Sequence, residues 1–388
     1  MKIVSIEPIA LTAPYLPMLP LPEPPKSNGR NCVWTRIETD DAITGWGEAY
    51  CGCYATDVTV AAIRRHSRSI IGMDPSDPDP VLKHMRFCNR YWGMRGIGAQ
   101  ATSAIEGALW DIVGKIHNQP VWKLLGDGKQ HPVMIYASDG GNPRTPQEIF
   151  EETRYYAGLG FRAYKMSCGG DPDENGDRVP IDRERVKAAR EGLGDERFLF
   201  VDVCVPQRSE NWERGHAERY MQALAPFKPR FMEEPAMTYE LSRYRELQAL
   251  SLIPTAGGES FTSSEEFEPF LATHALGVAQ PDAAVVGGPK SCVEVINRAR
   301  TLGIPVCLHC WCAGVGIAQN IQAACSVDGV LAMEFPQYKH PLATEPIKAI
   351  YTVEDGYLTP PIEPGLGVKI TEDLLVKYPY VPESDRDY

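Results

Sequence analysis

The chain has 388 residues, a length that suggests two domains or one large barrel with additions. Its 39 Lys and Arg residues and 51 Asp and Glu residues give a net charge of −12, so the surface lacks the positive charge that nucleic acid or anionic lipid would require. No apolar run approaches the roughly 20 residues that cross a bilayer. Glu7 also interrupts what would be the apolar core of a secretory signal, and the 11 Cys residues are scattered, so we expect a cytoplasmic protein with reduced thiols.

The first 125 residues have the pattern of an α+β domain. Residues 31–50 contain two β-rich runs around a turn at Asp40 and Asp41, which predicts a hairpin. Apolar residues then recur at helical spacing between Ala101 and Ile116, and this pattern ends near Gly126.

From about residue 133 the pattern changes to short apolar runs that alternate with amphipathic helical segments. Capping residues at Thr145 and Ser263 mark two of the helix starts. The alternation favours a (β/α)8 barrel over a doubly wound sheet, because the sequence has no Gly-rich phosphate-binding fingerprint. The eight predicted strands are 133–138, 162–168, 198–205, 230–235, 254–259, 277–282, 305–310 and 330–335.

These runs predict the domain organisation. We expect a capping domain at residues 1–125 and a barrel at residues 126–350. The strand-like run 351–361 is expected to return to the capping domain, so that about 350–388 complete it.

Polar residues stand near the end of most of the apolar runs. Because the carboxyl ends of barrel strands face one mouth, these side chains are expected to form a single site. Successive positions lie 23 to 37 residues apart, which is one strand and helix. In chain order the residues are Lys165, Asp202, Glu233 with Glu234, Glu259, Asp282, His309 and Glu334.

Three of these carboxylates, Asp202, Glu233 and Glu259, end consecutive strands. Carboxylates that converge within a few ångströms repel one another unless a cation lies between them. Oxygen ligands without Cys or His favour Mg²⁺ over zinc. The alternative is that each acid is solvated or paired separately at its own strand end.

Asp282 and His309 end the next two strands, and a carboxylate beside an imidazole can fix its tautomer and raise its basicity, as a general base requires. The alternative for a single His is a core residue with its hydrogen bonds satisfied. A zinc or redox cluster in the surrounding CLHCWC is disfavoured, because strand alternation puts Cys310 and Cys312 on the opposite face from His309.

The whole pattern resembles the enolase superfamily, in particular its mandelate racemase subgroup. The resemblance rests on ITGWGEAY, ALWDIVGK, VDV, MEEP, GGES, QPD with a following GG, the His309 strand, MEF and PGLGV. It implies an α/β fold, a modified (β/α)7β TIM barrel under an N-terminal α+β capping domain. It also implies an essential Mg²⁺ and removal of the proton α to a carboxylate, which gives an enediolate.

The resemblance also implies roles for the residues at the strand ends. Lys165 would polarise the substrate carboxylate, and Glu334 would donate or share a proton with the enediolate oxygen. The remaining implied roles are Mg²⁺ binding by Asp202, Glu233 and Glu259 and a base dyad of His309 with Asp282.

One position departs from the family pattern. Ser167 stands where the family usually has a second lysine, the base on the opposite face of the substrate. A serine hydroxyl cannot hold a proton as a cation near neutral pH, so a racemase or epimerase that needs two bases is disfavoured. Elimination remains possible, because His309 can take the α proton and then protonate the departing hydroxyl.

The expected ligand is a small hydroxycarboxylate, and neither nucleic acid nor membrane is expected as a partner. We expect dehydration of a sugar acid, with a cycloisomerase of a sugar-acid lactone as the alternative and a non-enzymatic binding or assembly protein as a third reading. A homo-oligomer is expected. The substrate would be chosen by the segments 14–30, 49–54 and 169–178; expected pocket residues are Tyr15, Arg30, Tyr50, Ser167 and Trp311.

Overall fold

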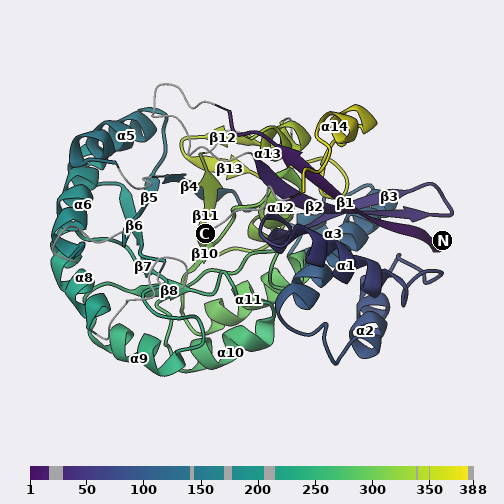
Figure 1. Ribbon diagram of the computed structural model, residues 1–388, viewed down its shortest axis with the longest axis horizontal. Coiled ribbons are helices and arrows are strands. Elements are labelled where there is room, and N and C mark those ends of the chain that lie inside the picture. The colour runs from purple at the N-terminus through teal and green to yellow at the C-terminus, as the bar shows by residue number, and fades with distance from the viewer. Residues whose placement is uncertain are drawn as a thin grey trace.

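The structure is a computed structural model that describes residues 1–16, 29–139, 144–169, 177–204, 215–337, 340–348 and 350–382. A three-stranded antiparallel sheet with helices forms one part, and a closed parallel barrel surrounded by helices forms the other (Figure 1). The predicted combination of a capping domain with a TIM-type barrel is confirmed.

The capping domain pairs its strands in the order β1-β2-β3, with the predicted turn at Asp40 and Asp41 between β2 and β3. Two glycines let β3 lie directly on helix α3. A Cβ atom at Gly47 would be 1.9 Å from the carbonyl oxygen of Ala104, and one at Gly45 would be 2.1 Å from that of Ala108. The elements are β1 (Ile3–Ala13), β2 (Arg30–Thr39), β3 (Thr44–Ala49), η1 (Tyr50–Cys53), α1 (Thr56–Ser67), α2 (Pro78–Cys88), α3 (Gly96–His117) and α4 (Val121–Leu125).

The barrel strands β4 to β11 pair in parallel with their chain neighbours, and β11 closes the barrel on β4. Each coincides with one of the eight predicted runs, although β4 and β11 extend one residue beyond theirs, so these predictions are confirmed. The strands are β4 (Val133–Asp139), β5 (Ala163–Ser167), β6 (Phe198–Asp202), β7 (Met232–Glu233), β8 (Thr255–Gly257), β9 (Val278–Ala279), β10 (Val306–Leu308) and β11 (Val330–Pro336).

Helices lie outside the strands, and α11 and α12 lie next to the capping domain (Figure 1). The predicted caps are present: Thr145 forms a capping box with Glu148, and the Ser263 side chain accepts from the Glu266 backbone N–H. These elements are α5 (Pro146–Gly158), α6 (Val179–Leu193), α8 (His216–Leu224), η2 (Ala225–Phe227), α9 (Leu241–Ala249), α10 (Ser264–Ala272), α11 (Pro289–Thr301) and α12 (Gly314–Ala324).

The barrel interior is apolar towards the amino ends of the strands. A buried cluster there takes residues from seven of the eight barrel strands and Phe231 from just before β7; it includes Tyr136, Phe200 and Cys307. Because side chains alternate along a strand, the next inward positions are the polar residues at the carboxyl ends. The polar site therefore stands above an apolar floor.

The C-terminal segment departs from the prediction in one respect. Strands β12 (Thr352–Glu354) and β13 (Tyr357–Thr359) form a hairpin that pairs with β4 of the barrel at Val133 and Met134, not with the capping sheet. These two residues precede the part of β4 that pairs with β11, so their backbone groups are open to another strand. The chain beyond does reach the cap, where Leu366 N–H donates to Asp111 at 2.8 Å. The remaining helices are α13 (Pro341–Thr344), η3 (Glu345–Ile347) and α14 (Glu372–Lys377).

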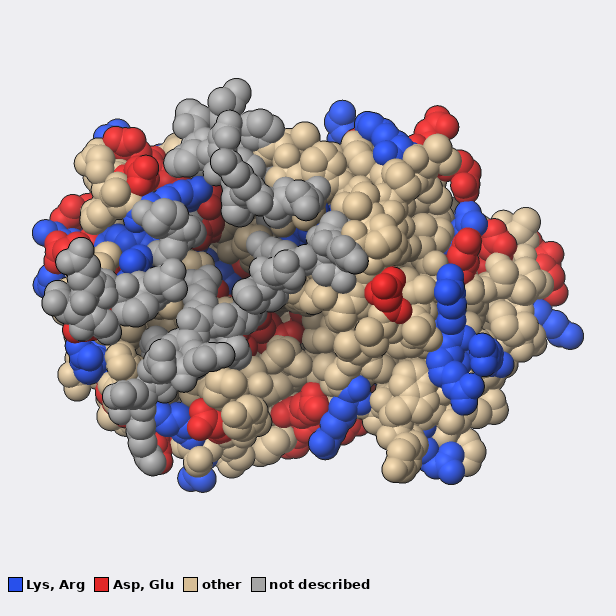
Figure 2. Space-filling model, in the orientation of Figure 1, with Lys and Arg blue, Asp and Glu red and all other residues tan. Residues whose placement is uncertain are grey.

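Within the described ranges, no helix combines the length and the apolar character needed to span a membrane. Acidic and basic side chains are interspersed around the barrel helices on the face that Figure 2 shows.

Candidate active site

The predicted polar residues meet at the carboxyl ends of the barrel strands. Lys165, Asp202, Glu233 and Glu334 lie in strands β5, β6, β7 and β11. Glu234 and His309 directly follow β7 and β10, and Glu259 and Asp282 lie two and three residues after β8 and β9. Most of the set is buried: Glu233, Asp282 and Glu334 have no exposed surface, and Lys165 and His309 are 4% and 2% exposed.

Lys165 joins two of the carboxylates. Its Nζ lies 2.9 Å from each Oε atom of Glu233 and 2.8 Å from Oε1 of Glu334. Burial alone would lower the pKa of Lys165, but Glu233 and Glu334 raise it well above its usual value. The ammonium is therefore a fixed positive charge at the floor of the site.

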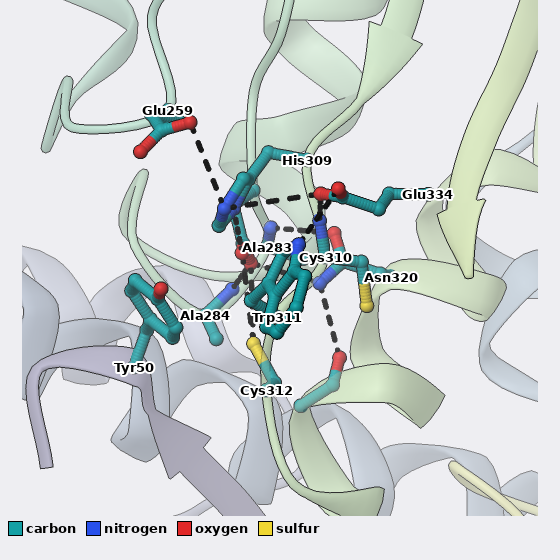
Figure 3. Close-up of polar contacts among 12 residues, drawn as sticks. Tyr50, Glu259, Ala283, Ala284, His309, Cys310, Trp311, Cys312, Asn320 and Glu334 are labelled. Carbon is teal, nitrogen blue, oxygen red and sulfur yellow. Dashed lines mark hydrogen bonds and ion pairs between the residues drawn. The ribbon is translucent and has the colours of Figure 1, made fainter. Parts of the chain in front are cut away.

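His309 and Asp282 form the predicted hydrogen-bonded pair, with Nδ1 of the imidazole 2.7 Å from Oδ2 of the carboxylate. An ionised carboxylate only accepts, which assigns the proton to Nδ1 and turns Nε2 to the site. Figure 3 shows His309 between Glu259 and Glu334, whose carboxylates lie 3.7 Å and 3.9 Å from Nε2. Burial lowers the pKa of the imidazole, but the neighbouring carboxylates, Glu259 first among them, raise it to about 10.

Glu334 is surrounded by donors. Its Oε1 accepts from Lys165 and, at 2.7 Å, from Nε1 of Trp311, and its Oε2 accepts from the backbone N–H of Cys310 at 3.0 Å. Burial opposes ionisation, but Lys165 and His309 hold the pKa of Glu334 at about 2. In this arrangement Glu334 is an ionised acceptor, which is not the state expected of a proton donor. The indole N–H of Trp311 is therefore already used in a hydrogen bond to Glu334.

Asp202, Glu233 and Glu259 reach the same end of the barrel from consecutive strands. In the described part of the chain, however, no three His, Cys, Asp or Glu side chains are gathered around one point as metal ligands would be. The reason is visible in the contacts, since Glu233 is turned to Lys165 and Glu259 to His309.

The charge balance of these residues fits a divalent cation. A further carboxylate, Glu234, is buried beside them, and burial together with Asp202 and Glu233 raises its pKa to about 8. Burial and Glu234 likewise raise the pKa of Glu259 well above its usual value. Such buried oxygen ligands with excess negative charge are typical of a Mg²⁺ site. All 11 cysteines are free thiols, so none forms a disulfide.

The capping domain covers His309. The ring of Tyr50 lies 5.3 Å from the imidazole, centroid to centroid (Figure 3). Its hydroxyl is 2.7 Å from that of Tyr54. Arg30 donates to the backbone oxygen of Trp311 and lies 3.5 Å from the Tyr15 hydroxyl. Ser167 ends β5 beside Asp202 on β6. Much of the predicted specificity segments, residues 17–28 and 170–176, lies outside the described residues.

Gln280 was not singled out from the sequence, although it belongs to QPD. It is fully buried, and neither atom of its amide has a hydrogen-bond partner among the described residues. Alternation along β9 directs it into the barrel. Each layer of side chains inside a barrel comes from alternate strands, and β5, β7, β9 and β11 alternate. Gln280 is therefore expected in the same layer as Lys165, Glu233 and Glu334.

The family models agree with this geometry. Residues 148–374 match the model described as enolase C-terminal domain-like, and residues 27–126 match the N-terminal domain of mandelate racemase and muconate lactonizing enzyme. The chain belongs to the enolase superfamily. Within this superfamily it has the two domains of the mandelate racemase subgroup, and it is an enzyme.

Two kinds of relative bear on the reaction of this enolase-superfamily enzyme. The D-galactonate dehydratase of Klebsiella pneumoniae (strain 342) is 29% identical over 357 residues, which cover 89% of this chain and 90% of that protein. The crystal structure of the 3,6-anhydro-D-galactonate cycloisomerase from Zobellia galactanivorans has a TM-score of 0.83 and 25% identity, covering 97% of this chain and 99% of that one. An enolase-superfamily member from Polaromonas sp. JS666 has a TM-score of 0.84 and 28% identity, with 98% of each chain covered.

Proposed function

We propose that this enzyme dehydrates a polyhydroxylated sugar acid in a Mg²⁺-dependent reaction that begins with loss of the proton α to the carboxylate. The observation that carries the proposal is the buried His309–Asp282 pair, 2.7 Å apart, at the mouth that also holds Lys165. The 29% identity to a D-galactonate dehydratase supports a hydro-lyase acting on a sugar acid.

His309 would act twice in the reaction. Its Nε2 takes the α proton, and the C–H electron pair becomes the carbon–carbon double bond of the enediolate. That electron pair then expels the β hydroxyl, which takes the proton from His309 and leaves as water. The resulting enol loses its hydroxyl proton and gains a proton at the β carbon, which gives a 2-keto-3-deoxy acid, so the reaction consumes no oxidant or reductant.

Lys165 would stabilise the negative charge that develops on the substrate carboxylate, because its buried ammonium is fixed before the reaction begins. Glu334, ionised and held by three donors, would keep Lys165 and Trp311 in place. This assignment replaces the proton-donor role that the family resemblance implied for Glu334.

Asp202, Glu233 and Glu259 would hold Mg²⁺, since they reach one mouth from consecutive strands and a divalent cation there would favour the ionised forms of Glu234 and Glu259, whose pKa values are raised in its absence. When bound, the ion supplies positive charge for the oxygens of the substrate carboxylate. Glu259 is also the carboxylate that most raises the pKa of His309, so a cation held by Glu259 favours the neutral imidazole that a base must be.

Ser167 supports elimination over racemisation. It ends β5 where the family usually has a second lysine, so in the described part of the chain β5 offers no strong base at that position to match His309. Gln280 supports a hydroxylated substrate, because its buried amide offers both a donor and an acceptor, as a hydroxyl group requires.

A cycloisomerase of a sugar-acid lactone is the second candidate. It is favoured by the match over 97% of this chain to the Zobellia galactanivorans 3,6-anhydro-D-galactonate cycloisomerase. One base would serve that reaction as well.

The two candidates differ in their products. We would incubate the enzyme and Mg²⁺ with D-galactonate, other aldonates and aldarates, and their lactones, and identify products by NMR. A 2-keto-3-deoxy acid supports dehydration, whereas turnover of a lactone alone moves the assignment to cycloisomerase. His309→Asn should lose several orders of magnitude in rate. The control is His274→Asn, an exposed residue with φ of +50° that asparagine tolerates.

A further inference from the structure

Asn320 on α12 is fully buried and contacts Asp282 of the dyad. Figure 3 shows its side chain in the group of polar contacts that includes His309. Its Nδ2 donates to Oδ1 of Asp282 at 2.8 Å and to the backbone oxygen of Gly316 at 3.1 Å. Its Oδ1 accepts from the backbone N–H of Ala283 at 2.9 Å. Both atoms of the side-chain amide are thus used, and they hold Asp282 and the residue after it.

These contacts divide the two oxygens of Asp282 between two tasks. Oδ1 accepts from Asn320 and, at 2.7 Å, from the backbone N–H of Ala284. Oδ2 lies 2.7 Å from Nδ1 of His309, and the Cys312 thiol adds weaker contacts to both oxygens, 3.7 Å from Oδ1 and 3.6 Å from Oδ2. Because two donors fix Oδ1, the carboxylate cannot turn about its bond without breaking them, and Oδ2 stays directed at the imidazole.

The position of Asn320 is itself fixed by the capping domain. The neighbouring Gln319 accepts from the backbone N–H of Glu48 at 2.6 Å and donates to the backbone oxygen of Ala283 at 3.1 Å. The Glu48 carboxylate accepts from the backbone N–H groups of Ala313 and Gly316, each at 2.7 Å, at the start of α12. Helix α12 therefore cannot rotate or slide without disturbing the cap.

We propose that Asn320 is a positioning residue for the His309–Asp282 dyad, and that it ties the orientation of the base to the docking of the cap through α12. The inference rests on the proposed function, since it assigns His309 as the base. Asn320 does not touch the substrate in this account. It acts through Asp282, as an outer hydrogen-bond partner acts through a ligand.

The test uses two substitutions of Asn320. Asn320→Ala removes all three side-chain hydrogen bonds, and Asn320→Asp keeps the size and the acceptor for Ala283 but loses the donor to Asp282 and Gly316. We expect either variant to lower kcat by about 10- to 100-fold with little change in KM. The matched control is Gln322→Ala. Gln322 is an equally buried amide on α12, and its hydrogen bonds within the described residues go to the backbone of residues 122, 365 and 366.

A spectroscopic readout separates positioning from a loss of stability. We would record the low-field proton resonance of the His309 Nδ1–H group, assigned by its absence in His309→Asn. It should shift or broaden in Asn320→Ala and stay unchanged in Gln322→Ala, even where both variants have a lower Tm. Unchanged kcat and resonance in the Asn320 variants, or a change in KM alone, would overturn the proposal. If the wild-type enzyme turns over no probe acid, the proposed function fails, and the resonance still decides the role of Asn320.

Discussion

Glu259 lies where the candidate metal ligands meet the candidate base. Its Oε2 is 3.7 Å from Nε2 of His309, and burial with Glu234 raises its pKa well above the usual value. A bound divalent cation would relieve that repulsion and would leave Glu259 ionised. The charge of this one carboxylate therefore connects metal binding to the state of the imidazole.

Glu259→Gln tests this connection. We expect the variant to weaken Mg²⁺ binding, measured by calorimetry, by more than the 10- to 100-fold that an outer partner of a metal site usually costs. Turnover should be lost with the fold retained, as judged by circular dichroism. The control is Glu354→Gln, an exposed acid on β12. Full activity of Glu259→Gln in chelator-treated buffer would show that Glu259 holds no essential metal.

At the scale of elements, the contact between β3 and α3 depends on glycine. A methyl group at Gly47 would lie 1.9 Å from the Ala104 carbonyl oxygen, which belongs to the helix backbone and cannot move by itself. We expect Gly47→Ala to lower the free energy of unfolding by about 1–3 kcal/mol, which is the usual cost of overpacking. The matched control is Gly158→Ala at the end of α5, where nothing lies within 4 Å of the new methyl group. Equal melting temperatures for the two variants would contradict the close approach.

A second element-scale prediction concerns Glu48, which joins β3 to the start of α12. One of its oxygens accepts from Ala313 N–H, and the other accepts from Gly316 N–H and from the Trp34 indole at 3.1 Å. Even when the carboxyl group is protonated, both of its oxygens can accept, whereas glutamine could accept with its oxygen only and would turn its NH₂ group to a backbone N–H. We expect Glu48→Gln to destabilise the protein by about 1–3 kcal/mol at pH 5, measured by denaturant unfolding.

The same substitution should change how stability depends on pH. Burial raises the pKa of Glu48 from 4.5 to about 7, although the N–H groups of Gly316 and Ala313 oppose the rise. The folded state therefore binds this proton more tightly than the unfolded chain does. The resulting stability is complete below pH 4.5 and is lost as the pH rises through 7. Between pH 5 and pH 8 the wild-type protein should lose stability relative to Glu48→Gln, and parallel pH profiles would contradict this.

For the whole molecule, the sequence predicts what is encoded locally. Each barrel strand is a short apolar run, and the residues that end these runs include both members of the dyad, which lie 2.7 Å apart. Which strand or helix an element will pack against cannot be predicted from the residues of that element alone. Residues 352–359 have a clear strand pattern, yet their contact with β4 depends on backbone groups that only the closed barrel leaves open.

The contacts that set the chemical state of the site were missed for the same reason. The bond from Trp311 to Glu334 spans 23 residues, that from Asn320 to Asp282 spans 38, and that from Gly316 to Glu48 spans 268. No periodicity or motif in the chain encodes such pairs. The ionised state of Glu334 could be inferred only after its three donors were located.

The central claim is that one base, His309, removes the α proton from one face of the substrate. The most direct test uses the two α epimers of the acid that the enzyme turns over, for example D-galactonate and D-talonate, with Mg²⁺ in D₂O. Proton NMR would follow each epimer separately. We predict that one epimer is converted to the 2-keto-3-deoxy acid and that the other is neither consumed nor formed, because Ser167 provides no base on its face. Interconversion of the two epimers would require a base on each face and would contradict the account.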